Sequence, residues 1–211
     1  MGEAPLTPEG FARELDVSRE TIERLAIHLD LLERWQGAIN LVGPKALRDP
    51  WRRLFLDSAQ LWRHLPPHAA RLVDLGSGAG FPGLVLAIMG VPGVHLIESD
   101  RRKAVFLREA ARLTGAPVEI HAERIERMAG FPADVVTARG LAPLPRLLEF
   151  AARFLAPATL SLFLKGRNLA GELTEARKNW HMTAHMSPSL SEPTGVVLEL
   201  QGVRRARDRQ P

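Results

Sequence analysis

The pattern of apolar and polar residues divides the chain near residue 67. In the first part, apolar residues recur at the intervals of three and four that are typical of an amphipathic helix. The clearest run follows Ser18 and consists of Ile22, Leu25, Leu29, Leu32 and Trp35. A capping hydroxyl followed by proline at 7–8 predicts an earlier helix, and residues 50–65 predict a later one that two prolines stop. Residues 1–66 are therefore expected to form a helical N-terminal extension.

Beyond residue 67, short apolar strands alternate with helices, which predicts an α/β fold with a parallel, doubly wound sheet. Two weaker strands, near 181–186 and 196–202, are expected to add an antiparallel edge. Residues 67–211 are therefore expected to form one Rossmann-like domain. Its strands are predicted at 71–76, 94–99, 117–122, 133–139 and 159–166, and its helices at 80–90, 101–114, 123–129, 144–155 and 168–179.

Composition excludes several classes of protein. The 211 residues are 45% hydrophobic and 25% charged, which is typical of soluble globular proteins. No stretch approaches the roughly 20 apolar residues of a membrane helix, and the first residues do not resemble a signal peptide, so a cytoplasmic location without membrane attachment is expected.

The absence of cysteine excludes thiol nucleophiles and cysteine-ligated zinc, and the absence of tyrosine argues against a short-chain dehydrogenase. Only His64 and His68 have helical spacing, and two prolines interrupt it, so no metal site is expected.

The net charge of +4 is unevenly placed. Residues 1–66 hold 9 Lys/Arg against 10 Asp/Glu, whereas residues 67–211 hold 19 against 14. This pattern fits a polyanionic partner such as RNA, although a solvated helix face and a soluble tail would carry the same charges. The basic residues that form the two densest groups are Arg101, Arg102, Lys103, Arg108, Arg112, Arg204, Arg205, Arg207 and Arg209.

A glycine-rich loop, Asp-Leu-Gly-Ser-Gly-Ala-Gly-Phe-Pro-Gly at 74–83, follows the first predicted strand. Its alternating glycines let the backbone turn off the strand and approach a ligand closely. Residues 78–83 match the dinucleotide pattern G-x-G-x-x-G, which is weak evidence alone. The loop also matches a second pattern, in which an acidic residue, here Asp74, precedes the alternating glycines Gly76, Gly78 and Gly80. This pattern is the first motif of S-adenosylmethionine (SAM) methyltransferases. Asp74 favours SAM, because a carboxylate suits the amino group of a bound methionine and not a pyrophosphate.

Polar residues also end the other strands, where ligands and catalytic groups collect in an open α/β sheet. Glu98 ends the second strand and is expected to accept hydrogen bonds from the ribose hydroxyls, although an exposed strand end has the same appearance. The pair 122–123 falls where such folds contact adenine. Arg139 and Lys165 end the fourth and fifth strands and are the candidate catalytic residues, although surface ion pairs would also explain them.

Missing motifs limit the acceptor of the methyl group. The Asn/Asp-Pro-Pro-aromatic motif of amino-group methyltransferases does not follow the fourth strand, and methylation of pyrimidine carbon 5 requires a cysteine. A ring nitrogen remains, as does a hydroxyl activated by Lys165 together with a carboxylate. Guanine N7 has a lone pair and no proton to lose, so its methylation requires alignment with the methyl carbon and sulfur but no general base. Arg139 would then bind base edges or phosphate.

Seven segments resemble, in order, the RsmG (GidB) family of bacterial 16S ribosomal RNA guanine-N7 methyltransferases. The resemblance covers roughly residues 20–170 and implies a class I SAM-dependent methyltransferase fold with a helical N-terminal extension. It also implies methylation of a guanine in the decoding-region loop of the small ribosomal subunit. The segments are LLERWQGAINLVG (31–43), LDSAQLW (56–62), VDLGSGAGFPGLVLAI (73–88), ESDRRKAVFLREAARLTG (98–115), HAERIE (121–126), DVVTARGLAPLPRLLEF (134–150) and LFLKG (162–166).

The resemblance also assigns roles at matching positions. It implies cofactor contacts at the five residues named at the end of this paragraph. Their positions in the motifs indicate that Asp74 and Glu98 also line the cofactor site. A role at the mouth of the cleft is implied for Asn40, Asp57 and Ser58. One position departs from the family, because Leu54 replaces its usual histidine. The five implied cofactor contacts are Gly76, Phe81, Ala122, Glu123 and Arg139.

Two alternatives to an RNA methyltransferase remain open. One is a SAM-dependent methyltransferase of a small molecule, which is favoured if the basic segments have no role. The other is a non-catalytic protein that binds RNA or the ribosome on a degenerate Rossmann scaffold. Nothing in the sequence requires a dimer, so a monomer is expected.

Overall fold

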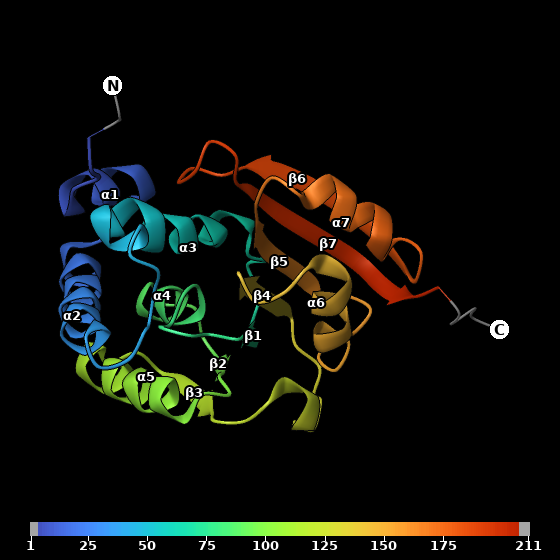
Figure 1. The fold of residues 1–211 in the computed structure, drawn as a ribbon, viewed down its shortest axis with the longest axis horizontal. Coiled ribbons are helices and arrows are strands. Elements are labelled where there is room, and N and C mark those ends of the chain that lie inside the picture. Colours follow the sequence, from blue (N-terminus) through green and yellow to red (C-terminus); the bar gives the residue numbers. More distant parts are fainter. Residues whose placement is uncertain (1–3, 207–211) are drawn as a thin grey trace.

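The computed structural model describes residues 4–206, so Arg207 and Arg209 lie outside the described residues. These residues form a seven-stranded sheet in the order β3-β2-β1-β4-β5-β7-β6, with helices on both faces (Figure 1). The first five strands pair in parallel, and β7 runs antiparallel to both of its neighbours. The predicted sheet and its antiparallel edge are therefore confirmed. The strands are β1 (Leu72–Leu75), β2 (Val94–Ile97), β3 (Val118–His121), β4 (Val135–Arg139), β5 (Leu160–Lys165), β6 (Trp180–Pro188) and β7 (Val196–Arg205).

The helices begin where the sequence provides caps. The Thr7 side chain accepts a hydrogen bond from the backbone of Gly10, and the Ser18 side chain accepts one from the backbone of Thr21, so one backbone N–H group at each helix start has a side-chain partner. Asp100 caps the basic helix in the same way. The α-helices are α1 (Pro8–Leu15), α2 (Arg19–Gln36), α3 (Asp57–Ala59), α4 (Gly83–Ile88), α5 (Arg101–Thr114), α6 (Leu144–Ala151) and α7 (Leu169–Ala176).

Several boundaries differ from those that the pattern predicts. Residues 50–65 form a π-helical segment at Trp51–Leu56, then α3, then a 3₁₀ turn at Gln60–His64. Half of these residues are buried, in runs of consecutive positions, so the segment packs on several sides and does not present one apolar stripe. The helix predicted at 123–129 is only a 3₁₀ turn at Ile125–Arg127, and α4, α6 and α7 are shorter than predicted. Conversely, β6 and β7 are longer, because they pair with each other over most of their length.

The N-terminal helices pack directly on the sheet. One core cluster joins residues before position 67, such as Leu25 and Leu32, to α4, α5 and one face of the strands. A second cluster fills the space between the other face and α6 and α7. The two segments that the sequence divides near residue 67 therefore share a core in the described residues. None of the described helices combines the length and apolar character that a membrane crossing requires.

Candidate active site

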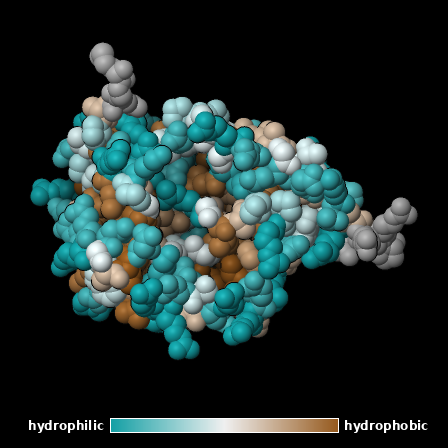
Figure 2. Space-filling model, viewed as in Figure 1, coloured by the Kyte–Doolittle hydropathy of each residue, from teal (hydrophilic) through white to brown (hydrophobic). Residues whose placement is uncertain are grey.

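The glycine loop leaves β1 and borders a cavity of about 360 Å³ at the carboxyl ends of the strands. Gly76 has φ +67°, and a Cβ there would lie 2.6 Å from a methyl carbon of Leu141, so a larger residue would be strained and crowded. The space-filling view shows this face hollowed at its centre, with apolar residues inside and hydrophilic ones around (Figure 2). We call this cavity the cofactor pocket. Its lining includes Gly76, Gly78, Glu98, Lys103, Glu123 and Leu141.

Asp74 lies beneath the loop and is fully buried. One carboxylate oxygen accepts a hydrogen bond from the backbone of Gly83 at 3.2 Å, and the other accepts one from the Thr137 hydroxyl at 2.8 Å. Burial raises the Asp74 pKa to about 6, although these hydrogen bonds oppose that shift. These hydrogen bonds join β1 to the start of α4 and to β4, and Asp74 is not part of the lining of the cofactor pocket. Its expected contact with a methionine amino group stays a prediction.

Glu98 lies directly after β2 and is nearly buried. Its Oε2 accepts a hydrogen bond from the backbone of Gly78 at 2.9 Å, and its Oε1 accepts one from the backbone of Asp100 at 2.7 Å. These two contacts fix the carboxylate at the wall of the cofactor pocket. Each oxygen keeps acceptor capacity for a second hydrogen bond, as the expected ribose contact requires.

The remaining predicted cofactor residues are divided. Glu123 lines the cofactor pocket, whereas Ala122 is exposed and is not part of its lining. Phe81 is buried on the other side of the loop, where its ring stacks on His28 with centroids 5.0 Å apart. Phe81 borders a neighbouring hollow that also contains Leu54, the residue in place of the family's histidine. Leu54 is buried in the core, so the described geometry makes it a packing residue.

Arg139 ends β4 and connects the N-terminal helical part to the sheet. Its Nε lies 2.8 Å from Asp57 Oδ2, and its terminal nitrogen donates to the Arg53 carbonyl at 2.8 Å. The guanidinium also lies over the Phe81 ring, 5.9 Å from its centroid. Burial raises the Asp57 pKa, and the Arg139 charge opposes that shift. Asp57 therefore orients a cation that borders the cofactor pocket.

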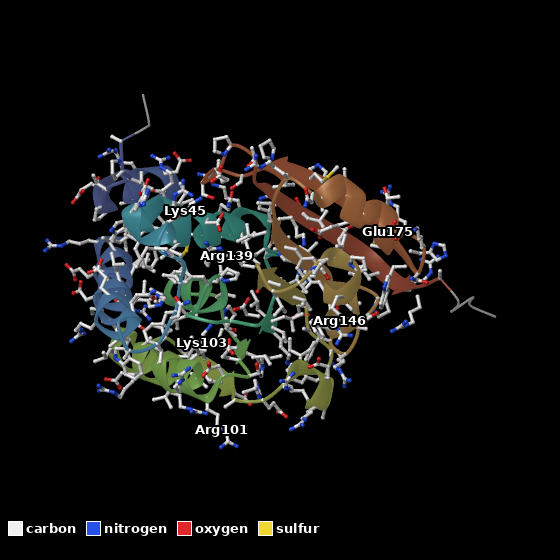
Figure 3. The ribbon with its side chains drawn as sticks, viewed as in Figure 1. Lys45, Arg101, Lys103, Arg139, Arg146 and Glu175 are labelled. Atoms are coloured by element: carbon white, nitrogen blue, oxygen red, sulfur yellow. The ribbon has the colours of Figure 1, made fainter. Side chains whose placement is uncertain are left out.

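A second cavity, of about 590 Å³, lies on the other side of Arg139. We call it the acceptor pocket, as the candidate site for the methyl acceptor that the sequence predicts. Figure 3 shows Arg139 between Lys45, which lines the acceptor pocket, and Lys103, which lines the cofactor pocket. The acceptor pocket is lined by residues from four parts of the chain, which include Lys45, Arg53, Asp57, Arg139, Lys165, Ser191 and Glu192.

Lys165 lies at the edge of the acceptor pocket with its charge paired. Its Nζ is 2.5 Å from Glu172 Oε2 and donates to the carbonyl of Ala142 at 3.2 Å. The side chain is almost fully buried. The two predicted catalytic residues thus line one pocket, but the carboxylate beside Lys165 already holds its ammonium.

Sequence reasoning missed the contribution of the β6–β7 loop. Ser191 donates a 2.5 Å hydrogen bond to Asp57 Oδ1, and Glu192 lies 3.4 Å from Arg53. These contacts join residues more than 130 positions apart. No local motif marks the loop, so only the antiparallel pairing that places it beside Asp57 reveals it. Of the residues expected at the cleft mouth, Asp57 lines the acceptor pocket, Asn40 is exposed, and the Ser58 hydroxyl is buried and donates to the Leu54 carbonyl.

His28 of α2 fixes the far side of the glycine loop. Its Nε2 donates to the carbonyl of Ala79 at 2.8 Å, while the buried Nδ1 has no hydrogen-bond partner among the described residues. Burial lowers the His28 pKa from 6.5 to about 4. The unfolded state therefore binds a proton at a higher pH than the folded state does. The stability that His28 contributes is complete above pH 6.5 and decreases as the pH falls towards 4.

We expect His28 alone to lower the free energy of unfolding by about 2 kcal/mol between pH 7.5 and pH 5, because one pKa unit corresponds to about 1.4 kcal/mol. Urea unfolding of the wild type and of His28→Leu at both pH values measures this contribution. Asp74 acts in the opposite direction in the same range, but it does so in both proteins and cancels in the difference. Equal pH dependence in the two proteins would contradict the assignment.

Known proteins resemble this chain in sequence over most of its length. The family model for rRNA small subunit methyltransferase G (GidB) matches residues 21–196. A protein named ribosomal RNA small subunit methyltransferase G from Rhodospirillum rubrum is 55% identical over 201 residues, which cover 95% of this chain and all of that one. Its namesake from Paramagnetospirillum magneticum is 56% identical over 200 residues, covering 95% and 98% of the two chains.

Solved structures share the fold at low identity. A mutant of MtNAS in complex with S-adenosylmethionine superposes with a TM-score of 0.59 at 14% identity, covering 93% of this chain and 84% of that one. A TehB-like SAM-dependent methyltransferase from Corynebacterium glutamicum gives 0.58 at 15% identity, covering 84% and 98%. These likenesses confirm the predicted class I methyltransferase fold. The family model and the extent of identity with curated relatives together show that the chain belongs to the ribosomal RNA small subunit methyltransferase G (GidB) family.

Proposed function

We propose that this chain transfers a methyl group from SAM to N7 of a guanine in the 16S ribosomal RNA of the small subunit. The observation that carries the proposal is the position of Arg139, which borders both the cofactor pocket and the acceptor pocket. A group bound in one pocket would therefore lie next to a group bound in the other. The names of the relatives support the same substrate class.

The residues of the cofactor pocket fit SAM. The loop at Gly76 provides a close backbone approach that a Cβ would obstruct, and Glu98 offers acceptor oxygens for two hydroxyls. Lys103 and Glu123 place one positive and one negative charge at the rim. When bound, SAM supplies a methyl carbon that is activated by a positively charged sulfur.

The residues of the acceptor pocket suit a nucleophile that needs no base. The lone pair of guanine N7 forms the new bond to carbon, the bond from carbon to sulfur breaks, and the positive charge passes to the purine. No proton moves, so the chain only has to hold the base in line. Arg139 and its partner Asp57 are placed for this orientation. The pairing of Lys165 with Glu172 disfavours the alternative of hydroxyl activation and leaves the lysine a positioning charge.

The decisive experiment uses labelled SAM and small ribosomal subunits that lack the modification. We expect one new N7-methylguanosine, identified by mass spectrometry of the nucleosides. Incorporation into another nucleoside would refute the proposed acceptor. Bound SAM without any incorporation into RNA would favour the small-molecule alternative or a binding protein.

We expect RNA affinity to fall steeply with salt, because phosphate contacts release counterions. Lys45 is exposed at the acceptor pocket, so Lys45→Ala should reduce the slope of log affinity against log salt by about 1. Lys178→Ala is the matched control, since Lys178 is an exposed lysine that pairs with Glu175 at 2.7 Å, away from both pockets. A filter-binding titration measures both slopes. Equal slopes for the two variants would show that Lys45 does not contact RNA phosphates.

A further inference from the structure

Two histidines and a glutamate meet on the outer strands of the sheet, outside both pockets. His95 lies on β2, and Glu119 and His121 lie on β3. In the parallel register, His95 pairs with Glu119 and Ile97 pairs with His121. Because alternate residues of a strand share a face, all three side chains project from the same side of the sheet. The two histidines are 26 positions apart in the sequence, so helical spacing gives no sign of this pair.

The three side chains place their ligand atoms close together. His95 Nδ1 lies 3.1 Å from His121 Nε2, and each of these nitrogens lies 3.5 Å from an oxygen of Glu119. The three potential ligand atoms all lie within 4.8 Å of one another. For comparison, tetrahedral zinc with bonds of about 2.0–2.1 Å separates its ligand atoms by about 3.3 Å.

The surroundings are suited to a metal ion that is held firmly and enters from solvent. Both imidazoles are only 16% exposed, whereas the Glu119 side chain is 66% exposed and leaves one side open. The Phe131 ring packs on the histidines, with centroids 4.9 Å and 6.4 Å away. The Arg71 guanidinium lies over the Phe131 ring, 5.6 Å from the ring centroid. Ligands on paired strands are positioned more rigidly than ligands on loops.

We propose that His95, Glu119 and His121 form a binding site for a divalent transition-metal ion of the zinc class. The ligands would be His95 Nδ1, His121 Nε2 and one Glu119 oxygen, with water completing a tetrahedron. Two imidazoles and a carboxylate form a recognised set of three protein ligands for zinc. The two nitrogens lie within hydrogen-bond distance, so one of them carries a proton. Binding of the ion at that nitrogen would move the proton to the other nitrogen of the same ring through solvent, so both ligands stay neutral imidazoles.

The site also lies near the cofactor pocket, because His121 ends β3 two residues before Glu123. A bound ion would brace an edge strand whose end leads into the pocket wall.

The test is calorimetric titration of the full-length, untagged protein with zinc sulfate, and with cobalt as a spectroscopic probe. We expect one ion per chain and a visible cobalt spectrum of a four-coordinate site. Glu119→Gln and His121→Gln should each weaken zinc binding by at least about tenfold. Glu119→Gln is the safer variant for folding, because its carboxylate is largely exposed. His95→Gln should weaken zinc binding to the same extent as these two variants. Circular dichroism establishes that each variant is folded.

The matched control is His185→Gln. His185 is 73% exposed and lies 3.5 Å from Glu199, so it is a histidine beside a carboxylate outside the proposed site. We expect its zinc affinity to equal that of the wild type. Absence of saturable binding by the wild type, unchanged affinity in Glu119→Gln and His121→Gln, or loss of binding in His185→Gln would each overturn the proposal. None of these results depends on methyl transfer.

Discussion

Replacement of Arg139 by alanine is expected to lower the rate of methyl transfer by at least about a hundredfold, because small errors in alignment cost that much. The guanidinium borders both pockets and is held by Asp57 and by the carbonyl of Arg53. Its loss removes the cation between the two pockets and leaves the Asp57 carboxylate, which is 15% exposed, without its ion-pair partner. Single-turnover transfer from labelled SAM to unmodified small subunits measures the effect, and calorimetry measures SAM affinity separately.

Arg19→Ala is the matched control for this variant. Arg19 is also an arginine in an ion pair, with Glu23 at 2.8 Å, but its side chain is 92% exposed on α2, and neither Arg19 nor Glu23 lines a pocket. Exposed ion pairs of this kind contribute little to stability, so this variant should retain wild-type transfer. Wild-type turnover in Arg139→Ala would show that Arg139 has no role in methyl transfer. A similar loss in both variants would show that the effect is not specific to the pockets.

Two glycines in helices should respond to alanine with opposite signs. At Gly83 of α4, a Cβ would lie 2.5 Å from a methyl carbon of Leu96 and 2.6 Å from the Cβ of Asp74. Gly83→Ala therefore pushes the helix away from β1 and disturbs the hydrogen bond to Asp74, at an expected cost of roughly 1–3 kcal/mol of unfolding free energy. At Gly171 of α7 the same Cβ meets nothing within 4 Å, so Gly171→Ala should gain roughly 0.5–1 kcal/mol.

Urea unfolding of both variants and the wild type measures these changes. The same midpoint shift in both variants would contradict the close approach of α4 to β1. SAM binding adds a second readout, because Gly83 and Asp74 hold the end of the glycine loop. We expect Gly83→Ala to weaken SAM binding and Gly171→Ala to leave it unchanged.

The local patterns that predicted the centre of the sheet were strong because β1, β4 and β5 are buried on both faces. A strand such as β4 has four fully buried residues before Arg139, so its apolar run is distinctive in the sequence. The caps at Thr7 and Ser18 were equally readable, because side chain and backbone are three residues apart. Segment 50–65 was harder to predict, because its burial depends on neighbours from α1 and α4 and not on one helical face.

Direct contacts of individual site residues were also less predictable. The position of Asp74 after β1 was evident, but its complete burial depends on Thr137 and Gly83, which the fold brings to it from other elements. Lys165 was visible at a strand end, whereas its partner Glu172 comes from the next helix. The position of a residue along the chain therefore indicated which edge of the sheet it occupies, but not which of its atoms are free.

The sequence by itself determined the alternation of strands and helices, the glycine loop and the family, because each of these depends on residues that are close together in the chain. Only the tertiary structure decided that Asp57 holds Arg139, that the β6–β7 loop reaches Asp57, and that His95 meets His121. The physical reason is that strand register and packing bring together groups that are 26 to more than 130 residues apart. Their hydrogen bonds and charges depend on that proximity, which no local spacing encodes.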